Sequence, residues 1–516
     1  MRRSLIAVVM ALICSYASAQ LTEQQQIQKL NLVYQQIRNN YVDDVPLEPL
    51  VEEAIIATLK ELDPHSQYLS QEDMAALQTR VRGEFAGIGI CYIVHNDTLV
   101  VRSTIENSPA SRAGIRPNDR IISADYKDIT SINADSISTI LRGDAGSKLR
   151  LVVVRRGESN HREIILKRDY VESSAISSSY RIGDVGYIAI SAFSKPMPSD
   201  FYTAYKALGD IRSLIIDLRD NSGGAISSAI DLSSLFLKKG DLIVTTEGKT
   251  SQKAFHKTQD RITIDIPIVV IINENSASAS EIFAGAIQDH DRGVIIGHTS
   301  YGKGLVQRVI DLKDGSGITL TIARYKTPSG RVIQRPYEMG NEEEYMRDSV
   351  RFQHPDSIPH DETLIFTTLK RGRKVYGGGG ITPDIYIDTN NLELSEYLYG
   401  FHSEALFDHA IIDYMDSINA ESLREQYPTY ETFDKEYTLD GNALEIFCHY
   451  AKIEGCAITP RDKEYIELML RASIAEELYG SNARHYIYGN HLDPMIKRGV
   501  EIAQQEQVFT LKFGDS

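Results

Sequence analysis

The stretch PIVVIINENSASASEIFAGAIQDHDRGVIIGHTSYGKGLVQ, residues 267–307, decides the fold of this chain. It begins with an apolar run rich in β-branched residues, which predicts a buried strand that ends near Asn273. A Ser/Ala turn follows, and ASEIFAGAIQDH predicts a helix that begins at Ala279. GVIIGH is a second apolar run. This order of strand, helix and strand is typical of a βαβ unit with parallel strands.

The same alternation extends beyond this stretch. DVGYIAIS and SLIIDLRD precede it and predict two further buried strands, while DFYTAYKALGDI and AISSAIDLSSLF predict helices between the strands. We therefore expect residues 169–390 to form an α/β core with a largely parallel sheet.

The segments that flank this core have different patterns. Residues 84–168 alternate short strand-like runs such as KLRLVVVRRG with turn signals, which is typical of a small β-rich domain. Residues 20–83 and 391–516 carry helical spacing, and the second segment has an apolar repeat at Ile466, Leu470, Ile474 and Leu478. The expected fold class is multidomain α/β, with the β-rich domain inserted before the core and helical regions at both ends.

The first 19 residues have the pattern of a cleaved secretory signal peptide. Arg2 and Arg3 supply the positive start, residues 5–13 are apolar, and the tripeptide at 17–19 offers small residues for cleavage. The apolar run is too short to span a bilayer. We expect the mature chain to be exported to a periplasm, with a lipid anchor on Cys14, and so membrane association, as the alternative.

Composition excludes several classes of partner. Acidic residues outnumber basic ones by 71 to 55, and the net charge of −16 argues against nucleic acid and an anionic membrane surface. The 13 histidines show no metal-ligand spacing, so we expect no metal and no cofactor. Cys91 is expected to be free and buried, whereas a disulfide between Cys448 and Cys456 is left open.

Ser278 lies where the expected strand meets the helix, and two interpretations of it compete. Backbone N–H groups at a helix N-terminus can bind a developing oxyanion, which suits a nucleophile. Ser278 and Glu281 also match a capping box, in which the serine only caps the helix. Local sequence alone favours the cap.

Lys303 stands in GHTSYGKG, a near-miss for a nucleotide-binding P-loop. The segment lacks Ser or Thr after the lysine, and a strand-like run follows where a helix is required, so we reject that interpretation. On a strand, Lys303 and Gln307 share a face, and a desolvated neutral lysine is a competent base for a serine. His298 leaves a Ser–His–Asp triad as the alternative, although the chain has no G-x-S-x-G elbow.

A series of segments in the same order makes the chain resemble the carboxyl-terminal processing peptidases, or tail-specific proteases, which are Ser–Lys serine proteases with a PDZ domain. The resemblance runs from Leu30 to Asp388. The segments are YVDDV, LKELDPHSQYL, FAGIGI, SPASRAGIRPNDRI, LRGDAGSKL, LIIDLRDNSGG, NSASASEI, YGKGLVQ, YKTPSGRVIQ and GGGGITPDI.

The resemblance implies a serine endopeptidase with a crotonase-like core that forms an acyl-enzyme and needs no cofactor. Ser278 matches the family nucleophile, Lys303 the general base and Gln307 the residue that positions the lysine. The oxyanion hole would consist of the backbone N–H groups of Ala279 and Gly224, with Gly223 as the alternative to Gly224.

The resemblance also implies that residues 84–168 are the PDZ domain. FAGIGI fits the loop that binds a peptide carboxylate, and the strand after it would pair with the substrate. The contact residues would be Gly87, Ile88, Gly89 and Ile90. Substrates with apolar C-termini are therefore expected. Arg142 is either structural or a link between this domain and the core.

The N-terminal helices expose apolar faces for which no neighbouring segment offers a core. These faces favour a homodimer formed through the helices, with burial against the rest of the chain as the alternative. The residues are Leu30, Val33, Ile37, Leu50 and Leu59.

Two other functions remain as alternatives. One is a non-catalytic peptide-binding scaffold of the same fold. The other is a thioester enzyme, which the retention of a whole PDZ domain disfavours.

Overall fold

The computed structural model describes residues 22–249, 253–259, 263–341, 344–345, 361–389, 394–395, 398, 404–452 and 458–505. The expected signal peptide, Cys14 and Cys456 lie outside these ranges, so the structure does not bear on export, lipid attachment or a disulfide at Cys456. Within the ranges, none of the helices combines the length and apolar character needed to cross a membrane.

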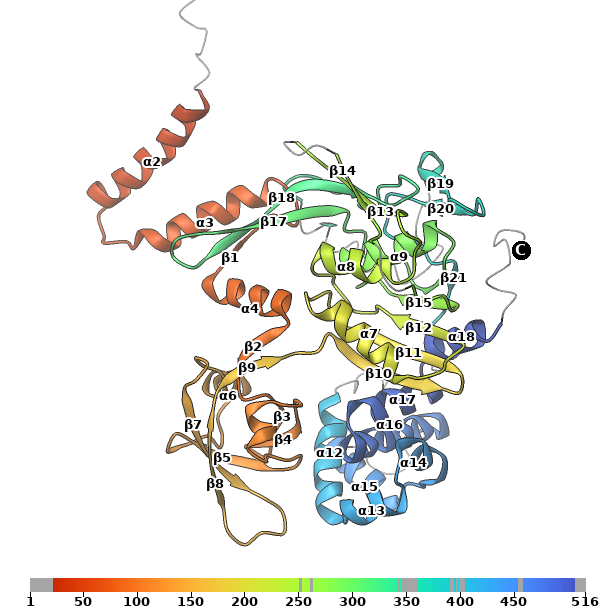
Figure 1. The fold of residues 1–516 in the computed structure, drawn as a ribbon. Coiled ribbons are helices and arrows are strands. Elements are labelled where there is room, and N and C mark those ends of the chain that lie inside the picture. Colours follow the sequence, from red (N-terminus) through yellow and green to blue (C-terminus); the bar gives the residue numbers. More distant parts are fainter. Residues whose placement is uncertain are drawn as a thin grey trace, which may run out of the picture.

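The core is a six-stranded sheet with the strand order β10-β11-β12-β15-β16-β21 (Figure 1). The strands from β11 to β21 run parallel, and β10 pairs antiparallel at one edge. The parallel sheet expected from the sequence is therefore confirmed. The strands are β10 (Ile176–Ile182), β11 (Val185–Ile190), β12 (Ser213–Asp217), β15 (Ile268–Ile272), β16 (Val294–Gly297) and β21 (Ile385–Tyr386).

Helices cover both faces of this sheet, so its central strands are buried throughout. Neighbouring side chains of one strand enter different cores. Val270 packs in the core beneath one set of helices, and Val269 packs on the opposite face against Met495 and Ile496 of α18. The helices are α7 (Met197–Ala207), α8 (Ile226–Ser234) and α9 (Ala279–Asp289) on the first face, and α18 (Pro494–Ala503) on the second.

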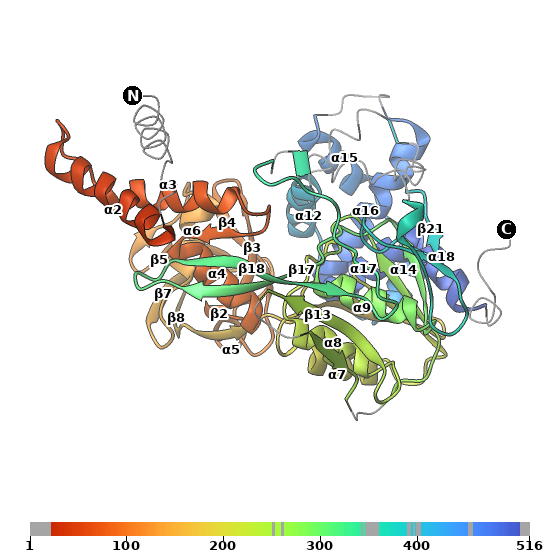
Figure 2. The same cartoon turned by 90° about the horizontal axis from the view of Figure 1, so that it is seen from above.

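A second sheet carries the strand that follows Lys303. β17 (Leu305–Asp311) and β18 (Gly317–Lys326) form a long hairpin that pairs with β1 (Gln67–Leu69) and extends toward the N-terminal helices (Figure 2). The sheet continues through β13 (Leu242–Gly248) and β14 (Ala254–Lys257). A short 3-10 helix at 362–364 leads into a small ribbon of β19 (Ile365–Thr367) and β20 (Lys374–Tyr376).

The β-rich domain is an insertion whose two ends lie together. β2 (Glu84–Gly87) leaves the body and pairs with β9 (Asp169–Glu172), which returns to it. The domain's main sheet has the order β3-β4-β5-β7-β8, which places β3 at an edge. Its elements are β3 (Ile90–His95), β4 (Thr98–Thr104), α5 (Pro109–Arg112), β5 (Arg120–Ala124), β6 (Lys127–Asp128), α6 (Ala134–Leu141), β7 (Lys148–Val154) and β8 (Arg162–Lys167).

Cys91 corrects one expectation. It is free, as predicted, but exposed rather than buried. Ile90 and Tyr92 on either side of it pack against the apolar core of the domain. Because successive side chains of a strand point to opposite faces, Cys91 must face outward.

The N-terminal segment forms α2 (Glu23–Asn40), α3 (Leu47–Lys60) and α4 (Gln71–Arg82). None of the α2 side chains is buried, and Leu30 and Val33 are 51% and 48% exposed. Leu59 differs from the expectation, because it is buried near the end of α3, which packs against β1. The open apolar face is therefore mainly that of α2.

The C-terminal region has two parts. Among the described residues, five helices pack around an apolar core to which α17 (Ser481–His491) also contributes Ala483 and Ile487. Ile466, Leu470, Ile474 and Leu478 are buried in it, as their spacing predicts. These helices, here called the helical bundle, are α12 (Glu404–Ser417), α13 (Ala420–Gln426), α14 (Tyr430–Glu436), α15 (Gly441–Tyr450) and α16 (Pro460–Tyr479). The next helices, α17 and α18, contact the core sheet.

Candidate active site

Ser278 lies between β15 and α9 and is partly exposed. Its backbone has φ 56° and ψ −109°, a region that a residue with a side chain rarely adopts. Such a conformation costs about 1–3 kcal/mol, so the surroundings must impose it. Two hydrogen bonds fix the preceding turn: Ser276 Oγ donates to the Leu218 carbonyl at 2.8 Å, and Ala277 N–H donates to the Asn221 carbonyl at 3.0 Å.

Glu281 does more than take part in a helix cap. It is fully buried, and its Oε2 accepts the N–H groups of Ser278 at 2.8 Å and of Lys303 at 2.9 Å. Its Oε1 accepts the Gly302 N–H at 2.6 Å and the Ser300 hydroxyl at 2.5 Å. Burial raises the pKa of this carboxyl, and the hydrogen bonds oppose the rise. One carboxylate thus joins the turn at Ser278 to the segment that carries Lys303.

Tyr325 on β18 joins the same two residues through their carbonyls. Its buried hydroxyl lies 2.6 Å from the Lys303 carbonyl oxygen and 3.2 Å from that of Ser278. Burial raises the pKa of this phenol well above its usual value, so the hydroxyl keeps its proton and can donate. Sequence reasoning gave Tyr325 no role, although this residue opens the segment YKTPSGRVIQ, and it gave Glu281 only the role of a cap partner.

Lys303 lies in the segment just before β17, and its amine reaches Gln307 on that strand. Its Nζ donates to Gln307 Oε1 at 2.8 Å. Burial lowers the pKa of Lys303; the Glu281 charge opposes this shift and the Arg80 charge adds to it. The described residues show no direct hydrogen bond between Ser278 Oγ and Lys303 Nζ. Catalytic contacts of this kind are often long in a resting enzyme and tighten when substrate binds.

Gln307 is held in turn by the DPHS segment. Its Nε2 donates to the His65 carbonyl. The His65 ring lies 2.9 Å from the Tyr345 hydroxyl, and burial, together with the Lys303 charge, lowers the pKa of His65 to about 4. The imidazole is therefore neutral at physiological pH and adds no positive charge beside the lysine.

The glycine pair after β12 lies against the turn at Ser278. A Cβ on Gly223 would come within 2.8 Å of Ser278 Cβ and 2.9 Å of Ala279 N, so the close approach requires glycine. The Gly223 N–H is already engaged, because it donates to Asn221 Oδ1 at 2.9 Å. Among the described residues, the N–H groups of Gly224 and Ala279 have no protein acceptor. This favours Gly224 over Gly223 as the second oxyanion donor.

His298 and His290, which lie near the ends of β16 and α9, have structural partners. His298 Nδ1 contacts Glu274 Oε2 at 3.1 Å, and its Nε2 contacts the Ile387 carbonyl at 3.0 Å. Both ring nitrogens are thus occupied away from Ser278, which argues against the Ser–His–Asp alternative. His290 Nε2 contacts the Leu242 carbonyl at 2.7 Å. Across the described ranges, no group of three or more His, Cys, Asp or Glu side chains could hold a metal ion.

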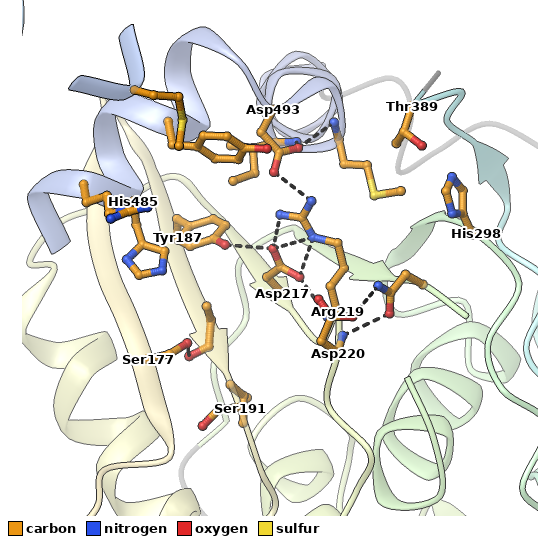
Figure 3. Close-up of a pocket in the computed structure, with 18 of the residues that line it drawn as sticks. Ser177, Tyr187, Ser191, Asp217, Arg219, Asp220, His298, Thr389, His485 and Asp493 are labelled. Carbon is orange, nitrogen blue, oxygen red and sulfur yellow. Dashed lines mark hydrogen bonds and ion pairs between the residues drawn. The ribbon is translucent and has the colours of Figure 1, made fainter. Parts of the chain in front are cut away.

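A cavity of about 730 Å³ lies between the core sheet and the C-terminal helices (Figure 3). Inside it the Arg219 guanidinium donates to the Asp217 carboxylate and pairs with Asp493 at 2.7 Å. The Tyr187 hydroxyl also donates to Asp217, at 2.7 Å. Because Arg219 leads directly into the glycine loop, this cluster anchors that loop from the side of the C-terminal helices.

The expected carboxylate loop forms the connection from β2 to β3. Gly89 has φ 77°, and a Cβ there would lie 2.3 Å from Ser108 Cβ, so the turn requires glycine. Ile88 is buried, and Ile90 opens β3. β3 pairs only with β4 among the described strands, which leaves its outer edge open for strand addition.

The junction between this domain and the core holds two arginines. The Arg142 guanidinium stands 5.9 Å from the centre of the Phe85 ring, at a cavity of about 560 Å³ lined also by Arg80. Arg80 donates to the Ser222 hydroxyl, next to the glycine pair. Arg142 therefore lies at the junction, which leaves both of its predicted roles open.

Models of known families match four parts of the chain. They describe peptidase family S41 at residues 184–340, a PDZ domain at 100–155, the N-terminal domain of the activating protease CtpB at 10–73, and a family of unknown function at 397–480.

Two bacterial carboxy-terminal processing proteases are similar in sequence to this chain. The carboxy-terminal-processing protease of Bartonella bacilliformis is 36% identical over 318 residues, which cover 60% of this chain and 73% of the relative. The carboxy-terminal processing protease CtpA of Bacillus subtilis is 33% identical over 310 residues, with 60% and 66% covered. Among solved structures, a photosystem II D1 C-terminal processing protease shares 29% identity at a TM-score of 0.33, with 58% and 83% covered. This chain therefore belongs to peptidase family S41, together with the carboxy-terminal processing proteases, and is a serine-type peptidase with a PDZ domain.

Proposed function

We propose that this chain is an exported endopeptidase that binds the C-terminal tails of proteins through its PDZ domain and cleaves them with a Ser278–Lys303 dyad. The observation that carries the proposal is the bond set of Glu281, whose carboxylate holds the backbones of both residues within one buried network. The lysine is desolvated and faces Gln307, as a neutral base requires.

In this proposal the neutral Lys303 amine takes the proton of Ser278 Oγ as the oxygen attacks the scissile carbonyl carbon. The N–H groups of Ala279 and Gly224 stabilise the oxyanion that forms. The carbon–nitrogen bond then breaks, and the lysine ammonium returns the proton to the leaving amine. Water, deprotonated by the same lysine, hydrolyses the acyl-enzyme and releases Ser278. The reaction needs no cofactor.

Recognition is proposed to take place at the PDZ domain. The turn from Gly87 to Ile90 would bind the free carboxylate, and the open edge of β3 would pair with the tail as an added strand. Ile90 and Tyr92 pack on the domain's apolar core, which supports a preference for apolar tails.

We also propose that the chain acts in a periplasm after removal of residues 1–19, and that it forms a homodimer through α2. The exposed apolar side chains of α2 support the dimer, since such faces are usually covered in the functional assembly.

Removal of either member of the dyad should abolish cleavage. Ser278→Ala and Lys303→Ala should each lower kcat/KM at least about 10³-fold with the fold retained, and Gln307→Ala should lower it less. Lys313→Ala, on the exposed end of the hairpin, is the matched control.

Because the base must be neutral, wild-type kcat/KM should rise with pH through a pKa that burial holds below the usual lysine value. Near-normal turnover by Lys303→Ala, or an optimum near pH 5, would contradict the dyad. Labelling of Ser278 by a fluorophosphonate would identify it as the nucleophile, and labelling of a different serine would contradict the assignment.

Glu281→Gln should uncouple the two residues without removing either. The amide replaces one acceptor oxygen by an NH₂ group that faces backbone donors, so we expect a loss of about 1–3 kcal/mol of stability and at least a tenfold fall in kcat/KM. Thermal unfolding and peptide kinetics measure the two effects. The control is Glu247→Gln, which changes an exposed glutamate on β13. Full activity in Glu281→Gln would show that the network does not position the dyad.

Amidation of a substrate's C-terminus should reduce cleavage. A neutral carboxamide loses a charge-assisted hydrogen bond worth about 1.5–3 kcal/mol, so kcat/KM should fall roughly 10- to 150-fold. The measurement compares peptides that differ only in this group. A bulky substitution at Gly89 is a poor probe, because the contact with Ser108 would disrupt the turn itself. Equal rates for the two peptides would show that the tail carboxylate is not read.

Light scattering tests the dimer. The mature chain should be dimeric at micromolar concentration, and Leu30→Glu combined with Val33→Glu should make it monomeric, because charges cannot be buried in an apolar contact. A monomeric wild-type chain would refute the assembly.

A further inference from the structure

The helical bundle contacts the PDZ domain through a dense set of charged and polar side chains. Basic or polar groups of the PDZ domain face acidic groups and helix-end carbonyls of the bundle. The PDZ side contributes residues of β3, β4 and β5 and of the segments beside them. The bundle side contributes residues of α12 and α16, together with the carbonyls of Met415 and Ile418 at the end of α12.

Arg102 of β4 is the centre of this contact. Its guanidinium pairs with Glu477 of α16 and with Asp408 of α12, the second at 3.2 Å. Asn118 Nδ2 donates to Glu477 Oε2 at 3.0 Å. The side chain of Arg102 is 11% exposed and that of Glu477 only 1%, so both groups have lost most of their hydration. Burial raises the pKa of Glu477 to about 7 even with the arginine beside it. Ion pairs on a freely accessible surface are not desolvated to this degree.

Three further contacts surround the centre. Arg120 of β5 pairs with Asp416 of α12. Arg156 donates to the carbonyls at the C-terminal end of α12, where a cation also complements the helix dipole. His95, at the end of β3, is 4% exposed and lies between Asp413 at 2.9 Å and His409 at 2.7 Å.

The PDZ domain needs such a contact to hold a fixed position. The described chain leaves the body at β2 and returns at β9, and these two strands pair with each other as a single ribbon. A ribbon of this kind can bend, so it does not by itself orient an inserted domain. The bundle can do so, because α17 follows α16 directly and packs on β10 of the core sheet. The bundle thus connects the PDZ domain to the core (Figure 1).

The contact leaves the expected peptide site uncovered. The residues that face the bundle come from the end of β3, from β4 and β5, and from the segments beside them. Within the described ranges, no hydrogen bond or ion pair joins the turn at 87–90 to the bundle, and the outer edge of β3 stays unpaired. A docked PDZ domain can therefore still receive a tail.

We propose that the helical bundle is a docking platform for the chain's own PDZ domain and fixes its tail-binding groove at a constant distance from Ser278. This function of the bundle rests on the proposed tail-specific cleavage. It assigns a role to the segment at 397–480, which matches a family of unknown function. A docked PDZ domain keeps the captured tail at a high effective concentration near the dyad. If the PDZ domain moved freely, the effective concentration of the tail at the dyad would be lower.

Spin-label distance measurements on the full mature chain test the docking directly. Labels at Lys127→Cys on β6 and Glu421→Cys on α13, with the native cysteines replaced by serine, report the separation of the two domains. The parent should give one narrow distance distribution. Arg102→Glu, which would face Glu477 and Asp408, should broaden it. Arg150→Glu should not, because Arg150 pairs with Glu163 inside the PDZ domain. A narrow distribution in Arg102→Glu would overturn the proposal.

A charge swap excludes simple misfolding. Arg120→Glu alone should broaden the distribution, and the addition of Asp416→Arg should restore it, since the swapped pair has the same geometry with reversed signs. Failure of the swap to narrow the distribution would show that this pair does not hold the domains.

Kinetics separate docking from chemistry. With Arg102→Glu, kcat/KM should fall about tenfold or more for a peptide long enough to reach both the groove and Ser278, and should stay within about twofold for a short ester that needs only Ser278. An equal loss for both substrates, or no loss for either, would refute the delivery role. A parent enzyme that cleaves neither substrate would refute the proposed function, while the distance measurement would still test the docking.

Discussion

The carboxylate of Glu281 is the interaction on which the catalytic arrangement depends. A charge with no exposure to water is tolerable only where donors replace its hydration, and here two backbone N–H groups, a third from Gly302 and a hydroxyl do so. Because these donors lie at the start of α9 and in the segment after β16, their hydrogen bonds to the carboxylate bring the turn at Ser278 and the segment of Lys303 together. The hydrogen bond from the Ser278 N–H to Glu281 also holds the strained backbone of Ser278 in place.

The loops around this carboxylate brace one another from opposite sides. Asn221 accepts from Gly223 and donates to the Ile190 carbonyl, while its own carbonyl accepts from Ala277. Asp220 accepts from the Asn273 side chain at 2.9 Å. The glycine loop after β12 and the turn at Ser278 are therefore cross-linked at several points. In the proposed reaction, such bracing reduces the reorganisation needed when charge develops on a substrate.

Much of this architecture follows from patterns that sequence displays. Apolar runs and helical periods predict the βαβ core and the helical ends. The strand period was expected to place Lys303 and Gln307 on one face, but Lys303 lies before β17 and the strand is irregular between Val306 and Gln307; the two side chains still meet through a hydrogen bond. The roles of Tyr325 and Glu281 could not be predicted in this way, because their partners are backbone groups, which every residue carries. The exposure of Cys91 was mispredicted for a related reason: scattered cysteines say nothing about which face of an edge strand they occupy. The contact between PDZ domain and bundle joins residues hundreds of positions apart, for example Arg102 and Glu477.

The position of the PDZ domain as an insertion with adjoining ends has an evolutionary consequence. Domains of this kind are easily exchanged in principle, because the host chain needs only a narrow gap to accept them. Here the exchange of the PDZ domain is restricted, because a replacement domain must also carry cationic side chains opposite α12 and α16. We therefore expect the arginines of the PDZ domain to be inherited together with their partners on α12 and α16. These arginines are Arg102, Arg120 and Arg156. If the bundle docks the PDZ domain as we propose, a lineage that changes one set without the other keeps the cleavage reaction but loses the fixed position of the tail-binding groove.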